Sequence, residues 1–167
     1  MTDPNVMVAY IRRARAGQTH EERVKGPYRL SGKLREPTVC PKCRAVYHKG
    51  RWQWIEAPKG ADEHLCPACL RMRDRAPAGM LTLSGDFFNE RKEEIKNLIR
   101  NASELAGKEH PLERVMAIED HEGQTVVTFT DAHITHGVGE ALRHAYQGEL
   151  DSRYSEEDGF LRVLWKR

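Results

Sequence analysis

The sequence predicts an α+β protein in which a four-cysteine zinc-ribbon module is followed by a small ferredoxin-like α/β unit and preceded by an extended basic arm. Three observations lead to this prediction. Four cysteines form two Cys-x-x-Cys pairs, strand and helix patterns alternate in the second half, and the first 37 residues combine many cations with few apolar side chains. The expected boundaries are 1–37 for a poorly ordered arm, 38–78 for the zinc-ribbon module and 79–167 for the α/β domain.

The composition favours a cytoplasmic protein. Of the 167 residues, 39% are hydrophobic and 31% are charged, and the mean hydropathy is -0.71. No run approaches the roughly 18 apolar residues that span a membrane, and the first residues lack the apolar stretch of a secretory signal. We therefore expect no membrane partner. The reducing conditions of the cytoplasm favour metal binding by the cysteines over disulfide formation.

The two cysteine pairs predict one structural zinc ion. Two residues within each pair, Cys40/Cys43 and Cys66/Cys69, allow a tight turn that directs both thiolates to one ion. The segment between the pairs is long enough for a hairpin, which the apolar residues at 46–47 and 52–55 predict around a turn at 48–50. Four thiolates close a tetrahedral site without an open position for water, so Zn²⁺ is the expected cofactor.

Two other uses of the four thiols stay open at this point. An iron–sulfur cluster is also held by four thiolates. A redox dithiol usually lies at the start of a helix beside a β-α-β pattern, and the sequence predicts no such context for either pair. The ligand pattern therefore favours zinc.

Charge is divided unevenly along the chain. Residues 1–78 carry 16 Lys and Arg against 8 Asp and Glu, whereas residues 79–167 carry 11 against 17. Cations neutralise phosphates, and the aromatic rings of Tyr47, Trp52 and Trp54 can stack on unpaired bases. For either tryptophan alone, a place in the small core of the module is the simpler expectation. The candidate RNA-binding residues are Arg12, Arg13, Arg15, Arg23, Lys25, Arg29, Lys33, Arg35, Lys42, Arg44, Lys49, Arg51, Arg71, Arg73 and Arg75.

Residues 79–167 predict the element order β-α-β-β-α-β-β. Strands are expected at 80–83, 112–119, 124–130, 149–154 and 160–165, and a helix is expected at 87–106. A second helix is expected to be capped by Asp131 or Thr130 and to end at Gly148. This order is compatible with a ferredoxin-like split β-α-β sheet that has an extra edge strand. The small residues Gly137 and Gly139 in the second helix indicate close packing against the sheet.

No catalytic motif is visible. There is no P-loop, no nucleophile elbow and no complete G-x-G-x-x-G loop, and the cysteines are assigned to the metal. His133 and His136 lie three residues apart but lack the glutamate of an H-E-x-x-H site. We therefore expect neither an enzyme nor a small-molecule substrate.

Several short segments, taken together, indicate a relationship to a known family. The segments are Cys40-Pro-Lys-Cys43, Gly50-Arg-Trp52, Leu65-Cys-Pro-Ala-Cys69, His110-Pro-Leu-Glu-Arg114, Thr130-Asp-Ala-His133, Val138-Gly139, Gly148-Glu-Leu150 and Leu161-Arg-Val-Leu-Trp165. They resemble the small bacterial relatives of the large-ribosomal-subunit export adaptor, the nonsense-mediated decay protein three family. The resemblance covers about residues 38–167 and implies a zinc-bearing protein associated with the ribosome or RNA. The chain lacks the additional cysteine knuckles and the export domains of the larger members.

These observations predict a non-catalytic, zinc-containing factor that binds the ribosome or its RNA in translation, ribosome maturation, or stress and hibernation. The acidic half would then face outward or meet basic ribosomal proteins. Two alternatives stay open. One is a zinc-ribbon adaptor for a protein partner, and the other is an enzyme with a site near His133 and Asp131.

Overall fold

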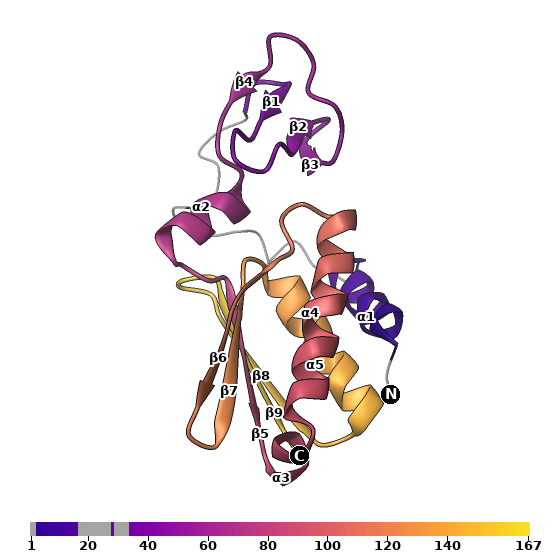
Figure 1. Ribbon diagram of the computed structural model, residues 1–167. Coiled ribbons are helices and arrows are strands. Elements are labelled where there is room, and N and C mark those ends of the chain that lie inside the picture. The colour runs from indigo at the N-terminus through magenta and orange to yellow at the C-terminus, as the bar shows by residue number, and fades with distance from the viewer. Residues whose placement is uncertain (1–2, 17–27, 29–33) are drawn as a thin grey trace.

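The computed structural model describes residues 3–16, 28 and 34–167. The architecture is α+β, as the sequence predicts, with a four-stranded sheet in the cysteine module (residues 34–78) and a five-stranded sheet in the C-terminal domain. Figure 1 shows the cysteine module at one end of that domain, with helix α2 between the two sheets. None of the helices in the described ranges is long and apolar enough to cross a membrane.

Four short strands form the sheet of the cysteine module, in the order β3-β2-β1-β4. β2 and β3 are the predicted hairpin. Its turn contains two residues with positive φ, Lys49 and Gly50, a pair that suits a tight hairpin. Their backbone N–H groups donate to the Glu36 carboxylate at 2.7 and 3.1 Å. The elements are β1 Thr38–Val39, β2 Val46–His48, β3 Arg51–Gln53, β4 Asp62–Glu63 and α2 Pro67–Asp74.

The C-terminal domain contains the second sheet, in the order β6-β7-β5-β9-β8. The predicted helix at 87–106 is divided into α3 and α4 at Arg91, and the remaining elements follow the predicted order. They are β5 Gly79–Ser84, α3 Asp86–Glu90, α4 Lys92–Glu109, β6 Val115–His121, β7 Gln124–Phe129, α5 Ala132–Tyr146, β8 Glu149–Ser155 and β9 Phe160–Lys166.

The last hairpin supplies one interior strand and one edge strand of this sheet. β9 pairs in parallel with β5, and β8 takes the edge. The reason lies in the side chains, because β9 alternates buried Leu161, Val163 and Trp165 with exposed residues while β8 is largely exposed. The strand with the clearer apolar face therefore takes the interior position.

Strand β6 begins at Val115, later than the predicted residue 112. Leu112 packs against the core of the cysteine module, and Glu113 is buried. The segment between α4 and β6 therefore joins the two parts of the molecule.

Helices α4 and α5 cover one face of the five-stranded sheet (Figure 1). Buried side chains from both helices and from β5, β7 and β9 form one core. A Cβ at Gly139 would lie 2.8 Å from the Val163 side chain of β9. The predicted close packing of this glycine against the sheet is confirmed.

The N-terminal segment is helical where a poorly ordered arm was predicted. Pro4–Ala16 form helix α1, and Met7, Val8 and Ile11 are buried in the core of the C-terminal domain. The prediction for 1–37 is therefore wrong in this segment. The buried apolar residues of this helix span little more than one turn, so they form no extended helical repeat in the sequence. The sequence pattern therefore did not reveal the helix.

Gly137 contacts α1 and not the sheet, contrary to the prediction for this residue. A Cβ at Gly137 would lie 2.5 Å from the Cα of Ile11. The missing side chain lets the backbones of α1 and α5 approach closely. This contact fixes α1 on the outer side of the helix layer.

Candidate metal centre

The four cysteines converge on one point. Each offers one sulfur, and all four sulfurs lie within 4.8 Å of one another. In a tetrahedral site with metal–sulfur bonds of ~2.3 Å, neighbouring sulfurs are about 3.8 Å apart. The Cys43 and Cys66 sulfurs are 3.7 Å apart. The cluster therefore has the size of a site that holds one metal ion by four thiolates.

The first cysteine pair lies in the tight turn between β1 and β2. The Cys40 N–H donates to the Ala45 carbonyl at 2.8 Å, and the Arg44 N–H donates to the Cys40 carbonyl at 2.9 Å. Arg44 has a φ of 71°, which reverses the chain within a few residues. Both sulfurs of this pair then face the second pair.

The second pair lies at the start of a helix, which the sequence pattern did not predict. Cys66 is the N-cap of α2, and its sulfur accepts from the Cys69 backbone N–H at 3.4 Å. Pro67 occupies the first helical position, where a missing N–H costs nothing. Dithiols at helix N-termini are also typical of redox sites. Here the first pair completes a set of four sulfurs, and that set favours a metal.

The electrostatics of the cluster also favour a bound cation. Burial, reinforced by the charges of Cys43 and Cys40, raises the pKa of the Cys66 thiol, and burial raises the pKa of Cys69. At Cys40, burial acts to raise the pKa, but backbone hydrogen bonds from Cys43 and Cys66 outweigh it and lower the pKa to about 7. Ionised sulfurs this close repel one another, and a divalent cation among them removes that cost.

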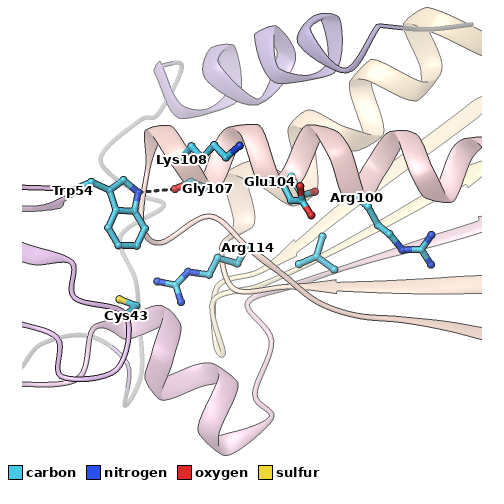
Figure 2. A pocket seen from close by; sticks show the side chains of 9 residues that line it. Cys43, Trp54, Arg100, Glu104, Gly107, Lys108 and Arg114 are labelled. Carbon is cyan, nitrogen blue, oxygen red and sulfur yellow. Dashed lines mark hydrogen bonds between the residues drawn. The ribbon is translucent and has the colours of Figure 1, made fainter.

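Arg114 contacts the cluster from the C-terminal domain. Its guanidinium nitrogens lie 3.4 Å from the Cys69 sulfur and 3.8 Å from the Cys66 sulfur, and Figure 2 shows the side chain directed toward Cys43. Burial acts to lower the pKa of Arg114, but hydrogen bonds with the sulfurs of Cys69 and Cys43 raise it. Because a divalent ion with four thiolates carries a net negative charge, this guanidinium offsets part of that charge.

Trp54 makes the second polar contact between the module and the C-terminal domain. Its indole N–H donates to the Gly107 carbonyl at 2.8 Å (Figure 2). Gly107 lies in the last turn of α4, and the residue four positions later is Pro111, which has no N–H to donate. The indole therefore satisfies a carbonyl that the helix leaves without a partner. Trp54 is 43% exposed, so the predicted core role holds for the buried Trp52 but not for Trp54.

Two of the three predicted RNA-binding cations of α1 contact acids of the C-terminal domain. Arg12 pairs with Glu109, and Arg15 pairs with Glu113 at 2.6 Å. Burial raises the pKa of Glu113, and the hydrogen bond from Arg15 opposes that rise. These two arginines therefore attach α1 to the protein.

Three predicted RNA-binding cations of the cysteine module are engaged within the protein. Arg71 is 7% exposed and lies over the Tyr28 ring, so it does not extend the positive surface as expected. Its guanidinium also donates to the Ala76 carbonyl at 3.1 Å. Arg35 and Arg73 form ion pairs with aspartates of the module.

The remaining predicted cations fall into two groups. The first is exposed and forms no ion pair within the described ranges: Arg13, Lys42, Arg44, Lys49, Arg51 and Arg75. The second lies outside the described residues: Arg23, Lys25, Arg29 and Lys33.

His133 and His136 border a separate pocket of about 290 Å³. The His133 Nδ1 lies 3.0 Å from the Asp131 carboxylate, which also caps α5 through the His133 backbone N–H. Among residues 3–16, 28 and 34–167, the four cysteines are the one group of three or more His, Cys, Asp or Glu side chains placed to share a metal ion.

No sequence pattern identified Arg114 or Gly107 as part of this centre. Arg114 is 45 positions from Cys69, and no local pattern marks such a contact. The spacing of Gly107 and Pro111 was a usable signal, because a proline four residues on leaves a helix carbonyl free.

Comparisons with known protein families, with curated proteins and with solved structures gave no match to this chain. The resemblance to the nonsense-mediated decay protein three family therefore stays a prediction, and the function has to be inferred from the geometry of the site.

Proposed function

We propose that the protein is a non-catalytic, zinc-containing factor that binds ribosomal RNA through the exposed cations around the first cysteine pair and the β2–β3 hairpin. The observation that carries the proposal is the position of Lys42, Arg44, Lys49 and Arg51. All four side chains are exposed, and all four belong to the small module that contains the four-sulfur cluster.

These cations are close together. Lys42 and Arg44 lie at the turn before β2, and Lys49 and Arg51 lie at the turn after it. Since β2 has three residues, the two groups are about 10 Å apart along the strand. The module's ion pairs within the described ranges involve Arg35, Arg73 and, when protonated, His48. The four cations are therefore available to phosphates.

Rigidity supports the same proposal. A metal ion held by four thiolates fixes the turn before β2 relative to the start of α2, and the Glu36 carboxylate bonds the turn after β2. Arg114 and Trp54 attach the module to the C-terminal domain. Cations that are already positioned lose little freedom when they meet RNA.

The cluster itself favours a structural role. Four thiolates leave no open coordination position for water or substrate, which supports a non-catalytic function. Zinc suits four thiolates in a tetrahedral arrangement. The resemblance to the export-adaptor family directs the proposal to the ribosome, in translation, subunit maturation or hibernation. The acidic C-terminal domain would face outward or meet basic ribosomal proteins.

The test is ribosome co-sedimentation with a charge-reversed double variant, Lys42→Glu with Arg51→Glu. We expect weaker association and a shallower salt dependence, because each lost phosphate contact removes about 0.7–0.9 from the slope of log affinity against log salt. The matched control is Arg91→Glu with Arg143→Glu, which changes the net charge equally. These residues follow α3 and end α5, away from the cysteine module in Figure 1.

Equal loss of binding in both variants would contradict the proposal, because it would mean that only net charge matters. Undiminished binding in the Lys42/Arg51 variant, without salt dependence, would favour the alternative of an adaptor for a protein partner. The exposed apolar side chains of Trp54, Ile55 and Met72 are the feature that such a partner would use.

A further inference from the structure

A cleft of about 770 Å³ lies between the cysteine module and α4, a volume within the range of about 300–1,000 Å³ that small-molecule sites occupy. Positions 100, 103, 104, 107 and 108 of α4 line it, which are the i, i+3, i+4, i+7 and i+8 positions of one helix face. Figure 2 shows Trp54 at one end of the cleft, Arg100 at the other, and Glu104 between them.

The Ser103 side chain is the first sign that this cleft takes a ligand. Ser103 lines the cleft and is 5% exposed. Its buried hydroxyl oxygen has no hydrogen-bond partner within the part of the chain that the structure describes. Buried hydroxyls are nearly always hydrogen-bonded in folded proteins, so the Ser103 hydroxyl has bonding capacity left for a polar group in the cleft.

The Trp54 ring is the second sign. Its N–H is engaged by the Gly107 carbonyl, which fixes the indole by one edge. The side chain nevertheless stays 43% exposed. A fixed, exposed indole face is a surface on which a nucleobase stacks.

The charges of the cleft fit a nucleotide as well. Arg100 and Lys108 are exposed at two positions of the α4 stripe, about 12 Å apart along the helix. Neither forms an ion pair within the described ranges, whereas Arg114 is committed to the cysteine sulfurs. Glu104 is the one carboxylate among the residues that line the cleft, and a carboxylate accepts hydrogen bonds from exocyclic amino groups.

We propose that this cleft binds one unpaired nucleotide of single-stranded RNA. The base stacks on Trp54, Ser103 and Glu104 bond its edge, and Arg100 and Lys108 contact the flanking phosphates. Because Glu104 accepts from an exocyclic amino group, the site prefers cytosine or adenine to uracil, which has none. This inference rests on the proposed RNA-binding function and adds a base-specific site to it.

The test uses the metal-loaded full chain and eight-residue oligonucleotides of cytidine, adenosine or uridine. Trp54 is the exposed member of the three tryptophans, while Trp52 and Trp165 are buried. A base stacked on Trp54 should therefore quench indole emission. We expect the quenching with oligo-C or oligo-A, at least about fivefold weaker binding of oligo-U, and no quenching in Trp54→Phe. Anisotropy of labelled RNA measures binding independently of the tryptophan.

Variants separate the cleft from the hairpin surface. Ser103→Ala should weaken oligo-C or oligo-A binding about 2–10-fold, and Glu104→Gln should remove the preference over oligo-U. The Lys42/Arg51 variant should weaken all three sequences alike.

RNA binding that leaves the emission unchanged, or that is unaffected by Ser103→Ala and Glu104→Gln, would overturn the cleft site and leave the proposed function intact. Equal affinity for CMP and for oligo-C would overturn RNA as the occupant in favour of a free nucleotide. No RNA binding by any method would overturn both proposals.

Discussion

Arg15 and Glu113 form the more buried of two ion pairs between α1 and the C-terminal domain. Glu113 has 1% side-chain exposure, and the Arg15 guanidinium donates to both of its carboxylate oxygens at 2.7 and 2.6 Å. Burial raises the pKa of this carboxyl and the guanidinium opposes that rise. Because Glu113 directly precedes Arg114, the pair also holds the residue that contacts the cysteine sulfurs.

Replacing Arg15 by Met should therefore destabilise the protein in a pH-dependent way. Without the guanidinium, the pKa of Glu113 rises further above its ordinary 4.5. Glu113 is then harder to ionise in the folded state than in the unfolded state. The resulting loss of stability is absent below the pKa of the unfolded state and grows as pH rises. We expect the free energy of unfolding to fall by about 1–3 kcal/mol near pH 7.5, and this loss should shrink toward about pH 5.5. Urea unfolding at several pH values measures it.

Arg12→Met is the matched control, because Arg12 and Glu109 form a similar pair at the surface. Their side chains are 55% and 34% exposed, so solvent screens the interaction. The expected loss of stability is therefore much smaller than that of Arg15→Met. A loss for Arg15→Met that stays constant or shrinks as pH rises would contradict the assigned role of Glu113.

Helix α1 is the element whose contribution the sequence pattern does not reveal. Ile11→Ala should cost about 2–5 kcal/mol of unfolding free energy, because it leaves a cavity where α1 meets α5. Val6 lies on the exposed side of the same helix, so Val6→Ala should change stability by less than about 0.5 kcal/mol. Thermal unfolding of both variants measures the difference. Equal, small effects would indicate that α1 does not pack on the domain.

The elements of the C-terminal domain were largely predictable because their patterns are local. The apolar face of α4 repeats at helical spacing, and the alternation in β7 and β9 marks strands with one buried face. The Asp131 cap and the hairpin turn at 49–50 are local as well. What the sequence did not provide is the pairing of β9 with β5, because strand order depends on contacts between distant segments.

The helix after Cys66 was missed for a different reason. Cysteine is not among the usual N-cap residues, so the start of α2 was not recognised. Pro67 at the first helical position was the available signal. Arg114 and Trp54 had no comparable signal, since each acts on a partner from a distant part of the chain.

At the scale of the whole molecule, the four-sulfur cluster links two units with different sources of stability. The C-terminal domain has a large apolar core that includes α1. The buried core of the cysteine module is small and consists of three cysteines, Trp52 and two alanines, with a few partly buried side chains packed against it. A core of that size does not fold a module alone, so the module should depend on a metal ion and the domain should not.

The last prediction follows from this asymmetry. Elemental analysis should find one zinc ion per chain, and its removal by a chelator should abolish amide-exchange protection in β1–β4 and α2, because metal binding supplies about 10–16 kcal/mol to such sites. Protection in α1, α4, α5 and the five-stranded sheet should persist, since their contacts are apolar. Loss of the Trp54–Gly107 hydrogen bond should change tryptophan emission at the same time.

Re-addition of metal provides the control for this experiment. Zn²⁺ should restore protection, and Mg²⁺ should not, because it prefers oxygen ligands to thiolates. Two results would contradict the prediction. Stoichiometric iron would assign the cluster to iron–sulfur chemistry. Undiminished protection of β1–β4 without metal would mean that the module is stabilised by its contacts with Arg114, Gly107 and Leu112 of the C-terminal domain. In that case the sulfurs would be free for redox chemistry at the start of α2.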